Sequence, residues 1–276
     1  MENKELSLPE IQQESFKVLL KLKEIMEEHN WNYCLAWGTL IGAVRHKGFI
    51  PWDDDIDIVM PRKDYEEFVQ YCIDHKEELL PYSLLNSRTN EKYLYLISRF
   101  TDATNFKYVP NKAKDYGQGT FVDVYPLDEC DEAEFEDNWN RLHNKYVKNM
   151  YLRATAKYCP TKTFIKNFVK WPLWNLVIRW QSHRKYQLAF EEEVKKINNE
   201  CKVSSRCTFW SESKVLYYSD DFFTEKKEME FNGVMFRVPN NYDRILKQAY
   251  GNYMKLPPEN ERNPHHEYKL YRINKE

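Results

Sequence analysis

The sequence predicts an α+β protein with one mixed β-sheet, flanking helices and a helical basic insertion. Three observations carry this prediction. Short runs rich in β-branched and aromatic residues recur between residues 32 and 125, helical apolar spacing flanks them, and residues 131–199 have a helical pattern throughout. Only 7 of the 276 residues are glycine, which disfavours Gly-rich dinucleotide-binding and P-loop folds.

The first elements follow from the spacing of apolar residues. Residues 8–28 carry an apolar stripe with helical periodicity, which predicts an amphipathic helix. Short strands and helices then alternate. The expected order is a strand at 32–37, a helical segment from Gly38 to Val44, a strand at 55–60 that Pro61 ends, and a helix at 63–75.

The later elements divide into strands, helices and a hairpin. Strands are expected at 82–87, 93–102 and 120–125, then helices over 131–199 with breaks at Pro160 and Pro172, a hairpin at 229–238 around Asn232-Gly233, and a helix at 242–250 stopped by Gly251. We therefore expect a catalytic core at 1–130, a helical, basic and aromatic region at 131–205, and a segment at 206–276 that completes the core.

Composition indicates a cytosolic protein. The first ten residues are polar, and no stretch approaches the roughly 18 apolar residues that a membrane span needs. The six cysteines are scattered without a C-x-x-C pair, so we expect reduced packing residues rather than disulfides or a metal framework.

Charge is distributed unevenly along the chain. Residues 138–190 contain eleven Lys and Arg and no Asp or Glu, so this segment carries +11 and the rest −13 of the net −2. Such segregation indicates an anionic partner. Within it, residues 164–180 interleave aromatic and aliphatic residues with Lys166, Lys170 and Arg179, as in an interfacial helix. A core helix with a solvated basic face is the alternative, and no nucleic-acid recognition motif is present, so we expect no nucleic-acid partner.

The segment Trp52-Asp53-Asp54-Asp55-Ile56-Asp57 carries the densest chemistry. On a strand, Asp53, Asp55 and Asp57 share one face, and Asp54 lies on the other. Three such carboxylates repel unless a cation neutralises them, and oxygen ligands suit Mg²⁺ or Mn²⁺. An EF-hand is excluded because positions 58 and 64 hold Ile and Asp rather than Gly and Glu.

Two further positions extend this site. Asp123 lies within a run of apolar residues, where an ionised carboxylate is expensive unless it is paired or metal-bound, so we expect a third ligand or a general base. Gly38 and Thr39, at a strand-to-helix turn, offer backbone N–H groups and a hydroxyl to a phosphate. Asp128 follows Pro126 and is expected to cap a helix starting near Glu132.

The runs GTLIGAVRH at 38–46, GFIPWDDDID at 48–57 and FVDVYPLD at 121–128 closely resemble the LicD family of phosphocholine transferases. Tyr250-Gly251 and Leu256-Pro257-Pro258 continue the likeness to the C-terminal part, where His265 and His266 also fit. The family is similar to fukutin-type enzymes and to the nucleotidyltransferase superfamily. By this resemblance, Gly38 and Thr39 match its phosphate-holding turn, Asp55 and Asp57 its metal-binding pair, and Asp123 its third carboxylate.

The resemblance implies a phosphotransferase of the CDP-alcohol type. It would move phosphocholine from CDP-choline to a sugar hydroxyl of a lipid-linked cell-surface glycopolymer precursor of teichoic acid or lipopolysaccharide type, releasing CMP with Mg²⁺ or Mn²⁺. It implies a bacterial enzyme that is peripheral at the inner face of the plasma membrane. Another CDP-alcohol such as CDP-ribitol, nucleotidyl transfer from an NTP, and a non-catalytic glycopolymer adaptor are the alternatives.

Four residues around the acids are expected to assist. Asp53 is an additional, weaker metal ligand. Arg45 is expected on the diphosphate because a guanidinium binds phosphate through two hydrogen bonds, and His46 beside it is a second contact. Trp52 offers an aromatic face to cytosine or to the choline ammonium, with core packing as the alternative role.

Overall fold

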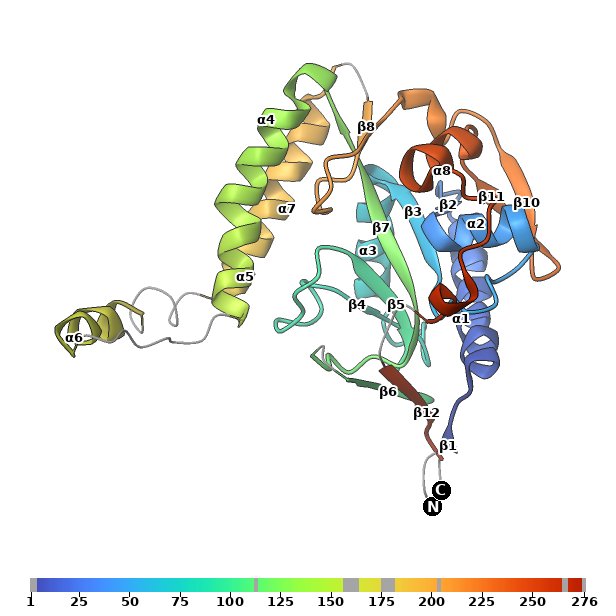
Figure 1. Ribbon diagram of the computed structural model, residues 1–276, viewed down its shortest axis with the longest axis horizontal. Helices are drawn as coiled ribbons and strands as arrows, with labels where there is room; N and C mark the ends of the chain where they lie inside the picture. The colour runs from blue at the N-terminus through green and yellow to red at the C-terminus, as the bar shows by residue number, and fades with distance from the viewer. Residues whose placement is uncertain are drawn as a thin grey trace. The chain divides into compact units, whose positions relative to one another are not determined.

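The structure is a computed structural model that describes residues 4–111, 114–155, 164–174, 182–202, 205–264 and 268–274 (Figure 1). The chain forms two compact units. One comprises Met1–Leu85, Ile97–Leu127 and Tyr217–Glu276, and the other comprises Asn86–Leu96 and Asp128–Leu216. Helices and a mixed sheet are both present, which confirms the α+β prediction. The proposed division of the chain at residues 130 and 205 stays a prediction.

The first unit is built on a mixed sheet. Its strands lie in the order β2 (Cys34–Leu35), β3 (Asp57–Pro61), β7 (Thr120–Cys130), β5 (Ser98–Asp102) and β4 (Ser83–Leu85). Strand β3 runs parallel to β7, and the other neighbouring pairs are antiparallel. Asp57 pairs with Asp123, and Arg99 pairs with the same Asp123 from the opposite side.

Helices α1 (Leu8–Glu28) and α3 (Arg62–Asp74) bury one face of this sheet (Figure 1). Leu22 of α1 and Phe68 of α3 belong to the same apolar core as Ile58, Val122 and Phe100 of the strands, and all five are less than 2% exposed. Because side chains alternate along a strand, this packing directs Asp57, Asp123 and Arg99 to the other face.

Smaller elements complete the first unit. Helix α2 (Trp37–His46) follows β2, and β10 (Lys227–Phe231) pairs with β11 (Val234–Val238). Asn232 and Gly233 join these two strands with φ angles of 50° and 80°, so the predicted hairpin is confirmed. Helix α8 (Tyr242–Tyr250) ends at Gly251, as expected. A second sheet, β1 (Lys4–Glu5), β12 (Tyr268–Arg272) and β6 (Phe106–Pro110), was not predicted.

Two sequence expectations in this region are wrong. Strand β7 runs through Pro126 to Cys130, so Asp128 lies within a strand and caps no helix; Asp131 is the N-cap of α4 (Glu132–Leu142). Asp128 is fully buried and accepts a hydrogen bond from Nδ2 of Asn198 at 3.0 Å. The strand expected from residue 55 begins only at Asp57, because the chain turns at 51–52 and is irregular to residue 56.

The second unit is mainly helical, as residues 131–199 predict. Helix α4 continues through a π-helical turn (His143–Val147) into α5 (Lys148–Thr155), and α7 (His183–Glu200) packs against them through a core that includes Phe135, Leu142, Phe190 and Val194. Strand β8 (Ser205–Cys207) pairs with the end of β7 and with β9 (Leu216–Tyr217). Helix α6 (Phe164–Leu173) contains Pro172, and Pro160 lies outside the described residues. No helix among the described residues is long and apolar enough to cross a membrane.

Candidate active site

Three charged side chains form a row across the sheet of the first unit. Asp57 on β3, Asp123 on β7 and Arg99 on β5 are register partners, so they project from the same face. All three are buried, with exposed fractions of 7%, 3% and 7%. Buried charges of this kind persist only when they are paired or bind an ion.

Arg99 and Asp123 form a two-pronged ion pair. Nε of Arg99 donates to Oδ1 of Asp123 at 2.6 Å, and Nη2 donates to Oδ2 at 3.3 Å. The two bonds fix the plane of the carboxylate. No local sequence pattern marks Arg99, because only the pairing of β5 with β7 brings it beside the acids.

One oxygen from each of Asp55, Asp57 and Asp123 lies within 4.8 Å of the others. Oδ1 of Asp57 is buried and accepts no hydrogen bond from the described residues, whereas a hydrogen bond from Tyr125 reaches the same carboxylate. A buried oxygen without a donor is costly, and a cation removes that cost. These three residues therefore fit a divalent cation such as Mg²⁺ or Mn²⁺.

Electrostatics inside the cluster disfavour negative charge. Burial, followed by the charges of Asp55, Asp123 and Asp53, raises the pKa of Asp57 well above its usual value. Burial raises the pKa of Tyr125 for the same reason, with the nearby carboxylates adding to it. A site that penalises its own carboxylates in this way gains when a cation binds.

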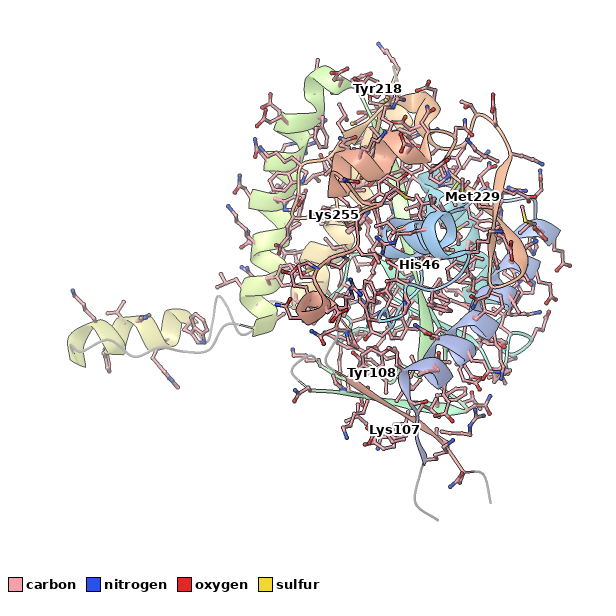
Figure 2. The ribbon with its side chains drawn as sticks, turned by 45° about the vertical axis from the view of Figure 1, so that its right-hand side comes forward. His46, Lys107, Tyr108, Tyr218, Met229 and Lys255 are labelled. Atoms are coloured by element: carbon pink, nitrogen blue, oxygen red, sulfur yellow. The ribbon has the colours of Figure 1, made fainter. Side chains whose placement is uncertain are left out.

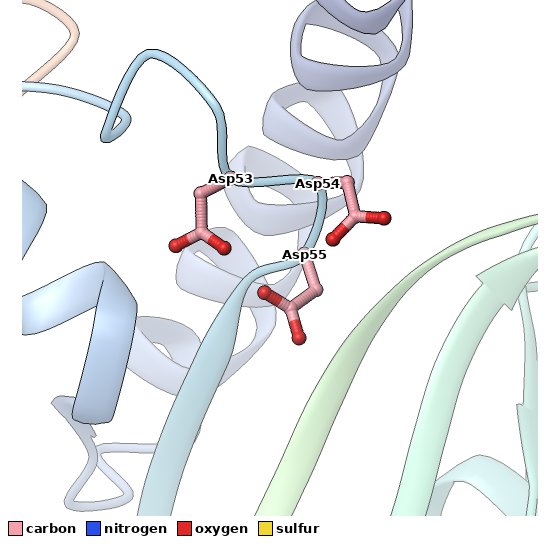
Figure 3. Close-up of side chains that lie close together, drawn as sticks. All are labelled: Asp53, Asp54 and Asp55. Atoms are coloured by element: carbon pink, nitrogen blue, oxygen red, sulfur yellow. The ribbon is translucent and has the colours of Figure 1, made fainter. Parts of the chain in front are cut away.

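The bend before β3 holds the remaining acids (Figure 3). Nε2 of Gln12 donates to the backbone oxygens of Asp53, at 2.8 Å, and Ile50, at 3.3 Å, and these bonds tie the bend to α1. Burial and the charges of Asp55 and Asp54 raise the pKa of Asp53 to about 7. Asp54 was expected to point away, yet oxygens of Asp53, Asp54 and Asp55 lie within 4.8 Å of one another, because these residues turn rather than alternate as a strand.

Helix α2 presents its first turn to these acids. A Cβ atom on Gly38 would lie 2.7 Å from Oδ2 of Asp53, so any other residue here would displace that carboxylate. Oγ1 of Thr39 accepts a hydrogen bond from the backbone N–H of Asp57 at 2.9 Å. Trp37, with φ of 47°, holds a backbone conformation that bulky residues rarely adopt. The structure thus places Gly38 beside Asp53 and ties Thr39 to the backbone of Asp57. The phosphate contacts expected of both residues stay predictions.

A cavity of about 750 Å³ opens beside the cluster, a size typical of small-molecule sites. Asp53, Asp55 and Asp57 line it, and Asp54 does not. Much of the opposite wall comes from residues 250–261, which the sequence marked only through the family resemblance. The other lining residues are Trp37, Gly38, Ile41, Arg45, Ile50, Trp52, Tyr250, Asn252, Tyr253, Lys255, Leu256, Pro257, Pro258 and Glu261.

Arg45 lines this cavity and anchors its wall. Nη1 of Arg45 donates to the backbone oxygen of Tyr253 at 2.7 Å, and Nε donates to Nε2 of His46 at 2.8 Å. Burial and the neighbouring guanidinium lower the pKa of His46, which keeps that nitrogen available as an acceptor. His46 ends α2 and is absent from the cavity lining among the described residues (Figure 2).

Trp52 lines the cavity and contacts a cation of the chain itself. The guanidinium carbon of Arg262 lies 5.5 Å from the Trp52 ring centroid, and Nε of Arg262 donates to the backbone oxygen of Pro257 at 2.9 Å. Trp52 therefore lines the cavity and also packs against Arg262. His265 and His266 lie outside the described residues.

Comparison with known proteins places this site in a family. A model described as "LicD/FKTN/FKRP, nucleotidyltransferase domain" matches residues 30–163. The lipopolysaccharide cholinephosphotransferase LicD of Haemophilus influenzae is 30% identical over 279 aligned positions, which cover 97% of this chain and 99% of that protein. The chain belongs to the LicD family. An uncharacterized protein of Rickettsia typhi is 33% identical over 113 residues, 41% of this chain and 34% of its own length.

The extent of these matches agrees with the site geometry. The LicD model covers Gly38, Thr39, the acids from Asp53 to Asp57, Arg99 and Asp123. The model stops before residues 250–261. The alignment with the Haemophilus relative spans nearly the whole chain and covers these residues. This LicD family member therefore carries the acidic cluster in the shared domain and builds the opposite cavity wall from its C-terminal part.

Proposed function

We propose that the protein is a divalent-metal-dependent transferase that moves phosphocholine from CDP-choline to a sugar hydroxyl of a lipopolysaccharide-type acceptor and releases CMP. The similarity to a lipopolysaccharide cholinephosphotransferase over nearly the full length supports the transferred group and the acceptor class. The family description supports a nucleotidyltransferase-like core. The donor and the metal are inferences from the site.

The observation that carries this proposal is the buried carboxylate cluster at a cavity of about 750 Å³. Asp55, Asp57 and Asp123 would hold Mg²⁺ or Mn²⁺, with Asp53 as a weaker ligand. Such an ion would neutralise the donor diphosphate and the charge of departing CMP. The cavity is large enough to hold a nucleoside diphosphate beside the acids. The negatively charged diphosphate would help the acids to hold the cation.

The chain's own residues would position the donor. Gly38 lines the cavity beside Asp53, and the first turn of α2, at Gly38 and Thr39, would offer backbone N–H groups to a phosphate bound there. Arg45 would add a guanidinium contact to the diphosphate while it holds the wall at Tyr253. Trp52 would face the base or the choline ammonium.

Asp123 is better suited to ligate a cation than to remove the acceptor proton. Both of its oxygens already accept hydrogen bonds from Arg99. These bonds fix the plane of the carboxylate, which suits a metal ligand whose oxygens must keep a set direction. We therefore assign Asp123 to the metal site.

The experiment is a donor panel with the full-length protein. CDP-choline, CDP-ribitol and CTP are each incubated with Mg²⁺ and with lipopolysaccharide or a teichoic acid precursor, and the released CMP or pyrophosphate and the modified acceptor are identified by mass spectrometry. The proposal expects CMP and phosphocholine-modified lipopolysaccharide. Faster turnover of CDP-ribitol would change the cargo, pyrophosphate from CTP would indicate nucleotidyl transfer, and acceptor binding unaffected by the pair Asp55→Asn and Asp57→Asn would indicate an adaptor.

We further propose that α6 docks the enzyme on the inner face of the plasma membrane, near a lipid-linked acceptor. Phe168, Val169 and Trp171 are 74%, 57% and 59% exposed. Helical spacing places Lys166 and Lys170 on the face opposite Phe168 and Trp171, as in peptides that lie in a bilayer interface. The acid-free charge of residues 138–190 favours anionic lipids. Residues 175–180, including Arg179, lie outside the described residues.

Sedimentation with vesicles tests this docking. We expect wild-type protein to bind phosphatidylcholine vesicles more tightly when they contain phosphatidylglycerol, and the pair Phe168→Ser and Trp171→Ser to bind about tenfold more weakly or worse. Leu80→Ser, at a residue 60% exposed in the first unit, is the matched control. Equal binding by the α6 variant and the control would refute the docking surface.

A further inference from the structure

Arg99 lies at the end of the charged row and contacts the acidic cluster through its two hydrogen bonds to Asp123. Its guanidinium carbon sits 4.3 Å from the ring centroid of Phe121, which precedes Asp123 by two residues on β7 and shares its face. The ring and the carboxylate together hold the guanidinium from two sides. Arg99 is thus a fixed part of the sheet surface rather than a mobile side chain.

The pairing leaves coordination capacity on Asp123. Each carboxylate oxygen has two lone pairs, and Arg99 uses one on each oxygen. An oxygen of Asp123 lies within 4.8 Å of oxygens of Asp55 and Asp57. The fork of Arg99 therefore decides which way the remaining lone pairs point.

Arg99 also balances charge in the row. Without it, Asp57 and Asp123 would be adjacent buried carboxylates that lack the guanidinium now paired with Asp123. The pair satisfies Asp123 and leaves Asp57, whose Oδ1 accepts no hydrogen bond from the described residues, as the acid that needs an ion. Asp123 is thus held by Arg99, whereas Asp57 is left to be neutralised by a cation.

We propose that Arg99 is a positioning residue that orients Asp123 toward the cation held with Asp55 and Asp57. This inference rests on the metal site of the proposed function. A hydrogen-bond partner behind a metal ligand commonly changes metal affinity 10- to 100-fold when it is removed. Lysine keeps the charge but has no planar fork, so it separates orientation from neutralisation.

The test is Mn²⁺ affinity, measured by calorimetry on wild type, Arg99→Lys and the control Arg62→Lys. Arg62 is equally buried, pairs with Glu66 at 3.3 Å and stacks on Tyr65, and it lies on α3 outside the site. We expect Arg99→Lys to bind Mn²⁺ roughly 10- to 100-fold more weakly and Arg62→Lys to bind as wild type. In turnover with CDP-choline, kcat should fall, and raising Mn²⁺ should restore part of it.

The other outcomes show whether the role of Arg99 or the metal site itself is wrong. A folded Arg99→Lys with wild-type Mn²⁺ affinity overturns the role of Arg99 and leaves the metal site standing. A folded wild type that binds no Mn²⁺, with or without CDP-choline, overturns the metal site itself. If Arg99→Lys does not fold, Arg99→Ala refolded with millimolar guanidinium replaces it, and recovery of Mn²⁺ affinity with guanidinium is the expected result; a folded protein without that recovery overturns the proposal.

Discussion

At the scale of single residues, we expect the charge of Asp57 to lower the stability of the metal-free protein and to bind the cation. Its carboxylate is buried beside Asp55 and Asp123, and its charge is disfavoured without a cation. We expect Asp57→Asn to raise the metal-free Tm by roughly 2 to 4 °C for each kcal/mol of relieved repulsion, to abolish the Tm increase on adding Mg²⁺, and to lower turnover about 100-fold or more. Differential scanning fluorimetry with Mg²⁺ and with EDTA measures the first two effects.

Asp54→Asn is the matched control for this prediction. Asp54 belongs to the second group of neighbouring acids, with Asp53 and Asp55, but does not line the cavity. Its variant should keep the Mg²⁺ response. Loss of that response in Asp54→Asn, with retention in Asp57→Asn, would move the metal to the bend at 53–55.

Two glycines of α2 give opposite predictions. A Cβ on Gly38 meets a side-chain oxygen of Asp53, which can move, whereas a Cβ on Gly42 lies 2.4 Å from the backbone oxygen of Gly48, which cannot easily do so. Gly38→Ala should therefore fold with nearly wild-type Tm and lose CDP-choline affinity. Gly42→Ala should lower the free energy of unfolding by about 1 to 3 kcal/mol. Calorimetry with donor and thermal melts separate the two; equal effects on stability would contradict the geometry.

At the scale of elements, the start of α1 is sensitive to acid. Oε2 of Glu10 accepts hydrogen bonds from N and Oγ of Ser7 at 2.9 and 2.8 Å. The hydrogen bond from Lys4, followed by those from Ser7, lowers the pKa of Glu10 to about 2. A carboxyl with a lowered folded-state pKa stabilises above its usual value of 4.5, and that stability disappears as pH falls through about 2.

The variant Glu10→Gln tests this dependence. The Tm difference between wild type and Glu10→Gln should be largest above the usual pKa of 4.5 and shrink toward zero as pH approaches 2. Melting curves across that range provide the measurement. A difference that does not change with pH would show that the Glu10 charge contributes nothing to the cap.

Local patterns predicted the elements better than they predicted how the elements meet. The apolar stripe of α1 and the Asn232-Gly233 hairpin are local signals, and both are confirmed. Strand β7 is longer than the strand predicted at 120–125, because pairing with β3 and β8 extends it to Cys130. The sheet β1-β12-β6 joins residues near both ends of the chain, a pairing that periodicity does not contain.

The same limit applies to the site. The site acids were identifiable from the sequence because a carboxylate among apolar strand residues is costly unless it is paired or bound to a metal, and the turn at Gly38 lies close by in the sequence. These acids are Asp53, Asp55, Asp57 and Asp123. Arg99 could not be selected, since it enters the row only through the register of β5 with β7. Asp54 was misplaced because strand alternation was assumed for a bend.

At the scale of the whole molecule, one cavity contains all the residues assigned to donor binding or lies beside them. The first unit contains the acidic cluster, the first turn of α2 and the wall at 250–261, so every residue assigned to donor binding belongs to one compact body. The second unit carries most of the acid-free basic segment and the exposed face of α6. A substitution at the donor site should therefore leave membrane docking intact, and a substitution on α6 should leave donor binding intact.

The most direct measurement is calorimetric titration of the full-length protein with CDP-choline, in Mg²⁺ and in EDTA, for wild type and Asp57→Asn. We expect wild type to bind in Mg²⁺, and binding to be at least tenfold weaker both in EDTA and in Asp57→Asn. Equal affinity in all conditions, or binding of CTP but not of CDP-choline, would contradict a metal-dependent CDP-choline site at the acidic cluster.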